Sequence, residues 1–344
     1  MTGAIALKIL LVAKCTRVFL FAAAGVLIAA LATGLVAWAS RISLLAALGS
    51  NVPDELAYVP GTARMVAYAD VRQVMSSPFR DRLRQFENSN PSSPDGLEAR
   101  TGINLETDID RILLASTASD DAVTPADRSL LVARGRFDTV RIEELMRKQG
   151  AQVDQYRGKR LVFIQDATHD AALAFVEPGL VLFGARDGVR GAIDAKAGAA
   201  DGISSNQEFM ALVNDVDEGT AWSVARFDSV SGRAPFPPAV VNQLPPINWL
   251  AASGRLDRGL HGLVRAEARD ARAAQNLRDV VQGFLALARL QGAREPAYKG
   301  ALDSVALTAD GKSVSLSFDL TPAVLDLLSS PANAPRRPAA PRRP

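Results

Sequence analysis

An uncharged apolar segment near the amino terminus constrains the rest of the chain most strongly. It comprises the twenty-two residues from Val18 to Ala39. An α-helix rises about 1.5 Å per residue, so a helix of this length reaches roughly 33 Å, which is enough to cross the hydrocarbon core of a membrane. We therefore predict a transmembrane anchor over residues 18–39.

The charges around this segment predict its orientation. Three basic residues precede it, Lys8, Lys14 and Arg17, and one closely follows it, Arg41. No acidic residue occurs before Asp54. Because basic flanks stay on the cytoplasmic side, we expect residues 1–17 to form a cytoplasmic N-terminus. The chain from about residue 41 onward is then exported, which predicts a single-pass protein of the bacterial inner membrane with its bulk in the periplasm or extracytoplasmic space.

A cleaved signal peptide is the alternative interpretation of the same segment. Ala37-Trp38-Ala39 has the small-x-small form of a cleavage site. The apolar core of a signal peptide usually runs about 7–15 residues, whereas this one is longer, so we favour an uncleaved anchor that contacts membrane lipid. Small residues four apart, Gly25 and Ala29 and then Ala30 and Gly34, also allow a homodimer through the helix.

Charge along the chain argues against a nucleic-acid partner. The formal net charge is +2, but the first 17 residues carry three positive charges and the tail from Pro331 carries four. The remaining residues hold 32 basic and 37 acidic side chains, so the body is acidic and lacks the basic stripe of a nucleic-acid-binding domain. Repeated Pro and Arg with few apolar residues predict a disordered tail over 331–344.

Periodicity predicts a first unit of strands and helices over residues 62–200. A strand ending at Asp70 and a helix are followed by two strands, a helix beginning after Asp138, a hairpin turning at Arg157-Gly158, two further strands and a closing helix. The strands are expected at 65–69, 112–116, 130–136, 172–176 and 180–183, and the closing helix at 187–197.

A second unit over residues 219–330 repeats this order. A strand ending at Asp228 precedes two strands, a longer helix beginning after Asp270, and a hairpin turning at Asp310-Gly311-Lys312. We therefore predict an α+β fold in which two similar antiparallel-sheet-plus-helix units, each with a β-α-β-β-α-β-β plan, follow the anchor. Residues 40–61 are predicted to be a linker, and residues 201–218 a helical connection between the units.

The exported part carries no motif that indicates catalysis, a cofactor or a metal. It contains two histidines, His169 in a loop and His261 at the start of a strand, and no cysteine, because the single cysteine of the chain, Cys15, precedes the anchor. No spacing typical of zinc ligands and no nucleophile motif occurs, so we predict no catalytic, cofactor-binding or metal-binding residues and expect the protein not to be an enzyme.

Three further patterns have ordinary structural explanations. Gly311-Lys312-Ser313 resembles the end of a phosphate-binding loop, but it lies between two strands and Ala306 stands where that motif needs glycine. Acid pairs at Asp108/Asp110 and Asp120/Asp121 fall in polar loops. The proline-rich segment 235–246 occupies the place of a helix in the repeat.

The start of the body resembles a group of uncharacterised bacterial membrane-anchored extracytoplasmic proteins. The resemblance is carried by residues 52–85, with Val59-Pro60, Ala63 and then Tyr68-Ala69-Asp70-Val71 as its motif. It implies an exported α+β module, and it implies no site residues.

Together these patterns favour a non-catalytic, membrane-anchored binding or assembly module of the bacterial envelope, with an envelope protein as partner. A lipid or small-molecule binding protein, with a cleft between the two units, is the alternative. An undetected hydrolase is a third interpretation. Apolar side chains lining such a cleft would favour the ligand-binding protein, and convergent carboxylates would favour the hydrolase.

The topology is testable with a compartment-specific reporter. A reporter that is active only outside the cytoplasm, fused after Ser329, should be active because the positive-inside rule exports everything beyond residue 41. An inactive fusion that is fully expressed would contradict the orientation. Mass measurement of the mature protein separates the two forms of the segment, since a new N-terminus at Ser40 would show a cleaved signal.

Overall fold

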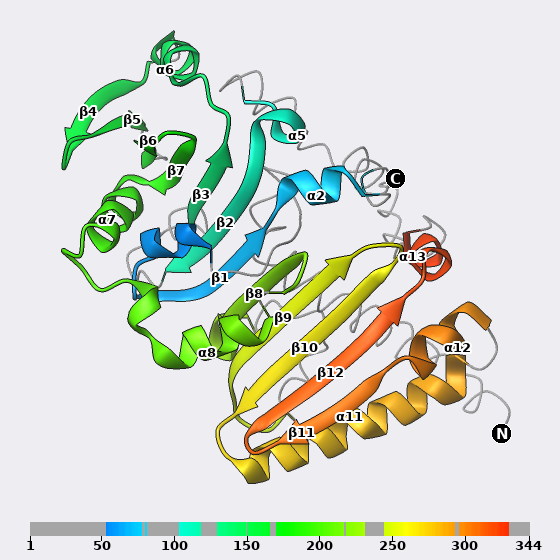
Figure 1. The fold of residues 1–344 in the computed structure, drawn as a ribbon. Coiled ribbons are helices and arrows are strands. Elements are labelled where there is room, and N and C mark those ends of the chain that lie inside the picture. Colours follow the sequence, from blue (N-terminus) through cyan, green and yellow to red (C-terminus); the bar gives the residue numbers. More distant parts are fainter. Residues whose placement is uncertain are drawn as a thin grey trace, which may run out of the picture.

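The computed structural model describes residues 53–77, 80, 103–117, 129–148, 150–165, 170–216, 218–230, 244–292 and 296–329. They form one antiparallel sheet of twelve strands, ordered β11-β12-β10-β9-β8-β1-β2-β3-β7-β6-β5-β4 (Figure 1). We call β1–β7 the N-terminal half and β8–β12 the C-terminal half. The strands are β1 (Ala63–Ala69), β2 (Ile109–Thr117), β3 (Ser129–Gly135), β4 (Gln152–Tyr156), β5 (Lys159–Gln165), β6 (Asp170–Glu177), β7 (Leu180–Ala185), β8 (Ala221–Arg226), β9 (Ile247–Leu256), β10 (Leu260–Ala268), β11 (Ala306–Asp310) and β12 (Ser313–Leu320).

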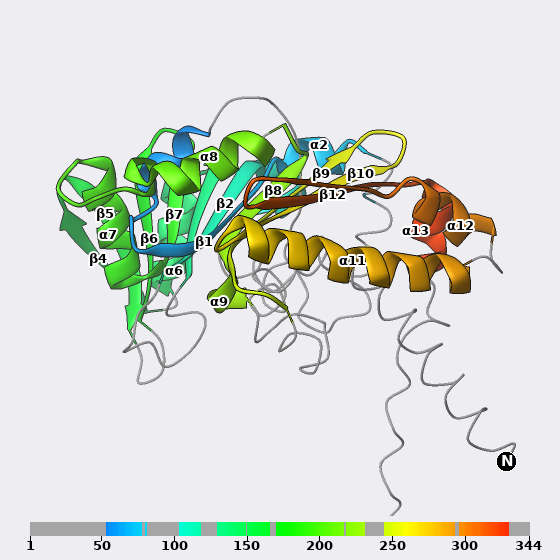
Figure 2. The ribbon, with the colours of Figure 1, turned by 90° about the horizontal axis from the view of Figure 1, so that it is seen from below.

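Helices cover the two faces of the sheet unequally (Figure 2). The front face, turned to the viewer in Figure 1, carries η1 (Asp54–Tyr58), α7 (Arg186–Lys196), η3 (Ile203–Ser205) and α8 (Gln207–Val216). The back face carries α2 (Val71–Met75), α6 (Thr139–Lys148), α11 (Ala271–Gly292), α12 (Pro296–Asp303) and α13 (Pro322–Ser329). Two short helices, α5 (Leu105–Asp108) and α9 (Phe227–Val230), lie next to β2 and β8 respectively. The predicted class, a mixed α+β fold with a large antiparallel sheet, is therefore confirmed.

The pairing of β1 with β8 joins the two halves at the centre of the sheet. Tyr68 on β1 lies directly opposite Trp222 on β8, and their rings stack at 5.6 Å between centroids. Phe209 of α8 meets Trp249 of β9 edge to face at 6.1 Å. These four aromatic side chains are buried in one core cluster that spans both halves. Burial raises the pKa of the Tyr68 hydroxyl to about 12, although the nearby Arg111 lowers it.

Aspartates cap two of the predicted helices of the back face, α6 and α11. The backbone N–H of Arg141 donates to the Asp138 carboxylate at 3.0 Å at the start of α6. The N–H of Ala273 donates to the Asp270 carboxylate at 2.8 Å at the start of α11. Each carboxylate satisfies an N–H that has no partner inside the helix, so both predicted N-caps are confirmed.

The two predicted hairpins form, with different turns. In the β4–β5 turn, Arg157 and Gly158 both have positive φ, 48° and 75°, as a type I′ turn requires. In the β11–β12 turn, Gly311 has φ of 54° and Lys312 does not have positive φ, which matches glycine at the first position of a type II′ turn. Gly311-Lys312-Ser313 is therefore a tight turn between strands.

The body begins upstream of the predicted boundary at residue 62. Leu56, Tyr58 and Val59 lie within the segment predicted as a linker, yet each is at most 3% exposed and belongs to the main core cluster. The sequence prediction also missed α12 and α13. The predicted anchor over 18–39 lies outside the described residues, and none of the helices that the structure describes is long and apolar enough to cross a membrane.

The strand order differs between the halves by one hairpin. Outward from the centre, the C-terminal half runs β8-β9-β10-β12-β11, and the N-terminal half runs β1-β2-β3-β7-β6-β5-β4. In both halves the last hairpin places its first strand at the sheet edge. The β6–β7 hairpin lies between β3 and β5, and the described part of the C-terminal half has no hairpin in the corresponding place.

The central aromatic contact generates a stability prediction. Replacing Trp222 with Ala should lower the free energy of unfolding by about 3–5 kcal/mol, because it removes a fully buried side chain and leaves a cavity between the halves. Urea unfolding of the purified full-length protein measures this change. Val140→Ala is the matched control, since Val140 is 77% exposed and its truncation should cost less than about 0.5 kcal/mol. Equal effects of the two substitutions would contradict the central role of Trp222.

Candidate functional site

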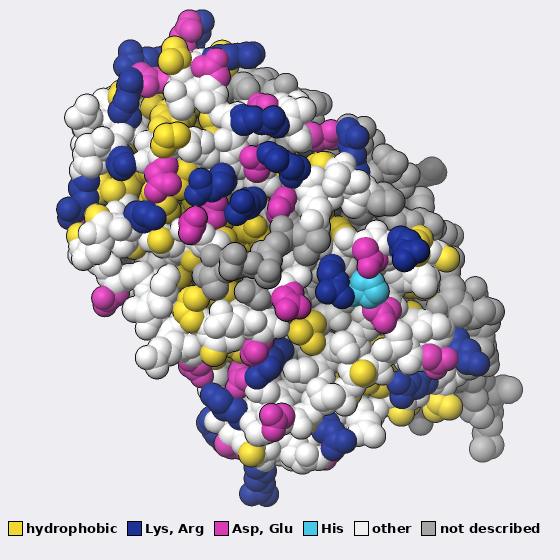
Figure 3. All heavy atoms as spheres, in the orientation of Figure 1, with side chains coloured by type: hydrophobic (Ala, Val, Ile, Leu, Met, Phe, Trp, Pro, Cys, Tyr) yellow, Lys and Arg dark blue, Asp and Glu magenta, His cyan; other side chains and the backbone are white. Residues whose placement is uncertain are grey.

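The front face of the C-terminal half is not covered by any helix that the structure describes, apart from α8 at its border with the N-terminal half (Figures 1 and 3). The strand register places its side chains in rows that cross β9, β10, β12 and β11. The rows are Arg255–His261–Asp319, Ser253–Leu263–Ser317–Ala306 and Ala251–Arg265–Ser315–Thr308. We call this surface, made of β10, β12 and β11 in these rows, the open face.

Small hydroxyl groups dominate the middle of the open face. Ser317 and Thr308 are exposed and Ser315 is half-buried, whereas the alternate residues of β12, Val314, Phe318 and Leu320, are buried against the back-face helices. This alternation explains why SVSLSFDL forms a strand with one buried face and one solvent-exposed face. The result is a surface rich in small hydroxyl groups between two groups of charged residues.

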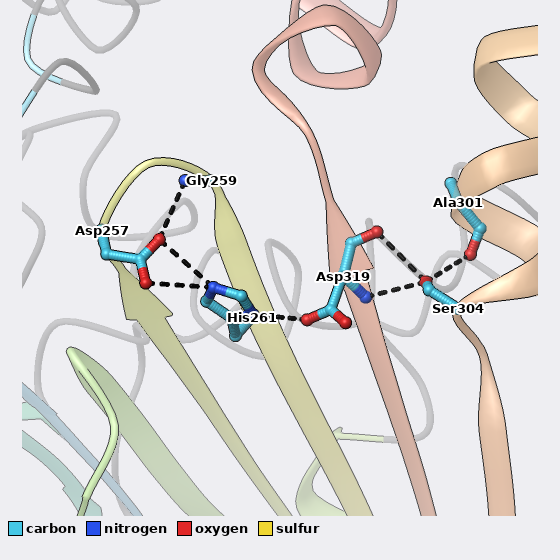
Figure 4. A network of polar contacts seen from close by, with 6 residues as sticks. All are labelled: Asp257, Gly259, His261, Ala301, Ser304 and Asp319. Carbon is cyan, nitrogen blue, oxygen red and sulfur yellow. Dashed lines mark hydrogen bonds and ion pairs between the residues drawn. The ribbon is translucent and has the colours of Figure 1, made fainter.

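The first charged group surrounds His261, the second residue of β10 (Figure 4). Its Nδ1 contacts the Asp319 carboxylate on β12, and its Nε2 lies 3.1 and 3.2 Å from the two carboxylate oxygens of Asp257. Asp257 is held in turn by the backbone N–H of Gly259 at 3.1 Å. Both ring nitrogens therefore face acceptors, an arrangement that only the protonated imidazole satisfies fully.

The surrounding carboxylates shift the titration of this group. Hydrogen bonding to Asp319, and then to Asp257, raises the pKa of His261 above its usual 6.5, although burial acts in the opposite direction. The pKa of Asp257 is lowered, first by the hydrogen bond from Gly259 and then by His261. When protonated, His261 links β10 to the β9–β10 turn through Asp257 and to β12 through Asp319.

The histidine is not arranged as a catalytic base. Ser304, which follows α12, donates from its hydroxyl to the carbonyl oxygen of Ala301 at 2.7 Å and accepts from the backbone N–H of Asp319 at 2.9 Å. Its contacts are thus with backbone groups rather than with the imidazole ring (Figure 4). A Ser-His-Asp relay needs the hydroxyl on one ring nitrogen and a single carboxylate on the other.

The second charged group joins the open face to α8. Glu267 on β10 is buried and accepts hydrogen bonds from the Ser313 hydroxyl and, at 3.3 Å, from Arg265. Lys312 Nζ lies 3.6 Å from Glu267 and 3.4 Å from Glu208 of α8. Arg265 also pairs with Asp215 of α8 at 3.1 Å. These pairs hold the helix against the border of the open face.

A third polar cluster lies on the front face of the N-terminal half. Glu55 of η1 is fully buried and accepts a hydrogen bond from Arg134 of β3. Glu177 of β6 lies 4.0 Å from Arg134 and accepts a hydrogen bond from the Tyr58 hydroxyl at 2.8 Å. Burial, followed by Glu177, raises the pKa of Tyr58. This cluster fastens η1 to the sheet, and we assign it a structural role.

The residues weighed from the sequence are dispersed rather than brought together. Asp108 accepts from the backbone N–H of Asn104 at 2.9 Å beside α5, and Asp110 pairs with Arg72 of α2. His169, Asp120 and Asp121, Cys15 and residues 235–243 lie outside the described residues. No group of three or more His, Cys, Asp or Glu side chains in the described part of the chain could hold a metal ion. The contact of His261 with Asp319 was missed because the two residues are 58 positions apart in the sequence.

Comparisons with known proteins reveal only a distant likeness. No protein-family profile and no curated protein matches this chain. Two solved structures, crystal forms IV and I of TP0453, are 9% and 10% identical to it and have TM-scores of 0.46 and 0.45. The alignments cover 81% and 82% of this chain and 98% and 100% of those chains. The resemblance of residues 52–85 to membrane-anchored proteins stays a prediction.

The His261 cluster generates a pH prediction. Because the folded-state pKa is raised, the stabilisation should be complete below about pH 6.5 and should be lost as pH rises through the folded-state pKa. The effect should stay below about 1 kcal/mol, because the side chain is 40% exposed and screened by solvent. NMR titration of the His261 ring should give a pKa above 6.5.

Substitution of the facing carboxylates tests the cause. Asp319→Asn should bring the pKa of His261 back toward 6.5, whereas Asp310→Asn, at the far end of β11, should leave it unchanged. A pKa at or below 6.5 in the unsubstituted protein would contradict the assigned arrangement.

Proposed function

We propose that this protein is a non-catalytic binding module, anchored in the bacterial inner membrane by residues 18–39, that engages an envelope protein through the open face. The observation that carries the proposal is the asymmetry of the sheet. In the described structure, helices pack on both faces of the N-terminal half, whereas the front face of β10, β12 and β11 has no helix over it. A sheet face without a covering helix, bordered by charges held in fixed positions, is available for contact with another protein.

The fixed charges support binding rather than turnover. His261 is held between two carboxylates, and Arg265 and Lys312 are engaged by acidic side chains of β10 and α8. Charges that are already positioned by partners within the protein need little reordering when a second protein docks. A proton-transfer residue, by contrast, needs a free nitrogen or oxygen within reach of a substrate.

A ligand cleft between the halves receives no support from the central strands. β1 and β8 pair over Met65–Ala69 and Ala221–Ala225, and the side chains of one core cluster fill the space on the front of this pair. We therefore prefer the partner-binding function to the lipid or small-molecule binding protein.

We further propose that the halves arose by duplication. The order of strands outward from β1 and β8 supports this, with the β6–β7 hairpin as an addition in the N-terminal half. The helices that begin after Asp138 and Asp270 both pack on the back face, as a repeated unit requires. In the second unit, α8 lies only at the border of the front face.

Site-directed photo-crosslinking in native membranes tests the partner-binding function. A photoreactive residue in place of Ser317 on the open face should capture a distinct protein, since this side chain is exposed at the centre of the surface. The same residue in place of Glu144, exposed on α6 at the back of the N-terminal half, is the matched control. Absence of an adduct at Ser317, or the same adducts at both positions, would contradict the open face as the binding surface.

A further inference from the structure

The two edges of the sheet differ in how they are protected. β4 forms one edge, and its residues contact α7: Asp154 pairs with Arg190 at 3.5 Å, and the Tyr156 hydroxyl donates to Asp194 at 2.8 Å. The adjoining Arg157 also pairs with Asp194. Charged side chains and a neighbouring helix are among the devices that keep an edge strand from pairing with other chains.

β11, the opposite edge, has α11 packed against it, and its strand itself offers little further protection. Its sequence, Ala306–Asp310, contains one charge at its last position, no proline and no irregularity in its register with β12. Four of its five residues are exposed. Within the described structure no strand pairs with its outer side. An edge of this kind is a template for a further strand.

The hairpin geometry identifies the backbone groups that point outward. In a two-residue hairpin the residues that flank the turn, here Asp310 and Ser313, form a hydrogen-bonded pair, and bonded pairs then alternate along the ladder. Leu307 and Ala309 are therefore the residues whose N–H and C=O groups face away from β12. An added strand would bond to these two residues.

A row of arginines runs beside this edge on α11. Arg289 donates to the carbonyl oxygens of Leu302 and Val305 at 3.3 Å, which places its side of the helix against the segment that leads into β11. Arg278 lies eleven residues earlier, which is three helical turns, so it occupies the same side at a distance of about 16 Å along the axis. Five residues of β-strand span about 17 Å, so the two arginines match the length of β11.

These arginines have no acidic partners in the part of the chain that the structure describes. Arg289 contacts backbone carbonyls only, and Arg278 makes no polar contact with the described residues. Two arginines elsewhere on the sheet are, by contrast, paired with carboxylates: Arg265 with Asp215 and Arg134 with Glu55. The edge thus combines free backbone groups with uncompensated positive charge.

We propose that β11 and the arginine side of α11 bind an extended acidic segment of a partner protein, which joins the sheet as a thirteenth strand. The inference rests on the proposed partner-binding function and names the chemistry of the partner. Alternate side chains of an added strand point to the back face, toward α11, so carboxylates at every second position can pair with Arg278 and Arg289. Backbone bonds to Leu307 and Ala309 supply the rest of the contact.

Charge excludes the two other occupants that this chain could supply. A second copy paired through β11 would bring its α11 to the same back face, so that two arginine rows would meet. The tail over 331–344 carries four arginines and repeated prolines, which lack the N–H that strand addition needs. An acidic segment of another protein remains the complementary occupant.

Peptide binding to the full-length protein in zwitterionic nanodiscs tests the proposal. The probes are two labelled ten-residue peptides, one alternating Glu and Val and one alternating Lys and Val, and fluorescence anisotropy reports binding. The acidic peptide should bind at least tenfold more tightly than the basic one. Equal binding, binding of neither peptide, or self-association of the protein through β11 would overturn the proposal.

Substitutions separate the backbone contribution from the charge contribution. Ala309→Pro removes an outward N–H and should weaken acidic-peptide binding at least tenfold without changing the melting temperature, because proline is tolerated where an edge N–H faces solvent. Arg278→Glu should weaken it by a similar factor. Arg272→Glu is the matched control, since Arg272 is exposed on the same helix about 120° away around its axis.

The two proposals can fail separately. Unchanged peptide binding in both Ala309→Pro and Arg278→Glu would overturn the edge site even if Ser317 captures a partner. Peptide binding with the expected losses would support the edge site even if the open face yields no adduct. Hydrogen exchange provides a further readout, since the amides of Leu307 and Ala309 should gain protection in the complex and that of Gln155 on β4 should not.

Discussion

The antiparallel pairing of β1 with β8 is the interaction on which the rest of this structure depends. Without it, the two halves would each present an open sheet edge, and the core cluster on the front face would be divided. Tyr68 and Trp222 stack across this pair, and Phe209 of α8 closes against the adjacent Trp249. Aromatic side chains bury large apolar areas, so these contacts stabilise the boundary between the two halves.

Polar interactions are distributed around this apolar centre according to their distance from solvent. Glu55 and Glu267 are buried, and each has a cation within reach, so the cost of their desolvation is partly offset. His261 and its carboxylates are more exposed and gain less from pairing. The buried pairs therefore fix the positions of η1 and α8 on the sheet. The exposed His261 cluster affects only the local conformation of the β9–β10 turn.

Local features of this fold are predictable from the sequence, and long-range ones are not. Asp138 and Asp270 cap helices through contacts three residues away, and Gly158 and Gly311 permit turns through their own φ angles, so short windows predict them. The pairing of His261 with Asp319, or of Arg134 with Glu55, depends on strand order over 58 and 79 residues. Segment 53–61 was predicted as part of a linker because an acidic stretch flanked by prolines is typical of one. The ion pair between the buried Glu55 and Arg134, 79 residues away, cannot be predicted from the neighbouring sequence.

The place where the chain meets the sheet has a mechanical consequence. η1 is fastened by Arg134 and Tyr58, and it leads directly into β1, the strand that β2 and β8 flank on both sides. A pull on the polypeptide upstream of residue 53 is thus delivered to the middle of the sheet. Unravelling from that end must rupture a buried ion pair and then two ladders at once, whereas a pull from an edge strand would open one ladder at a time.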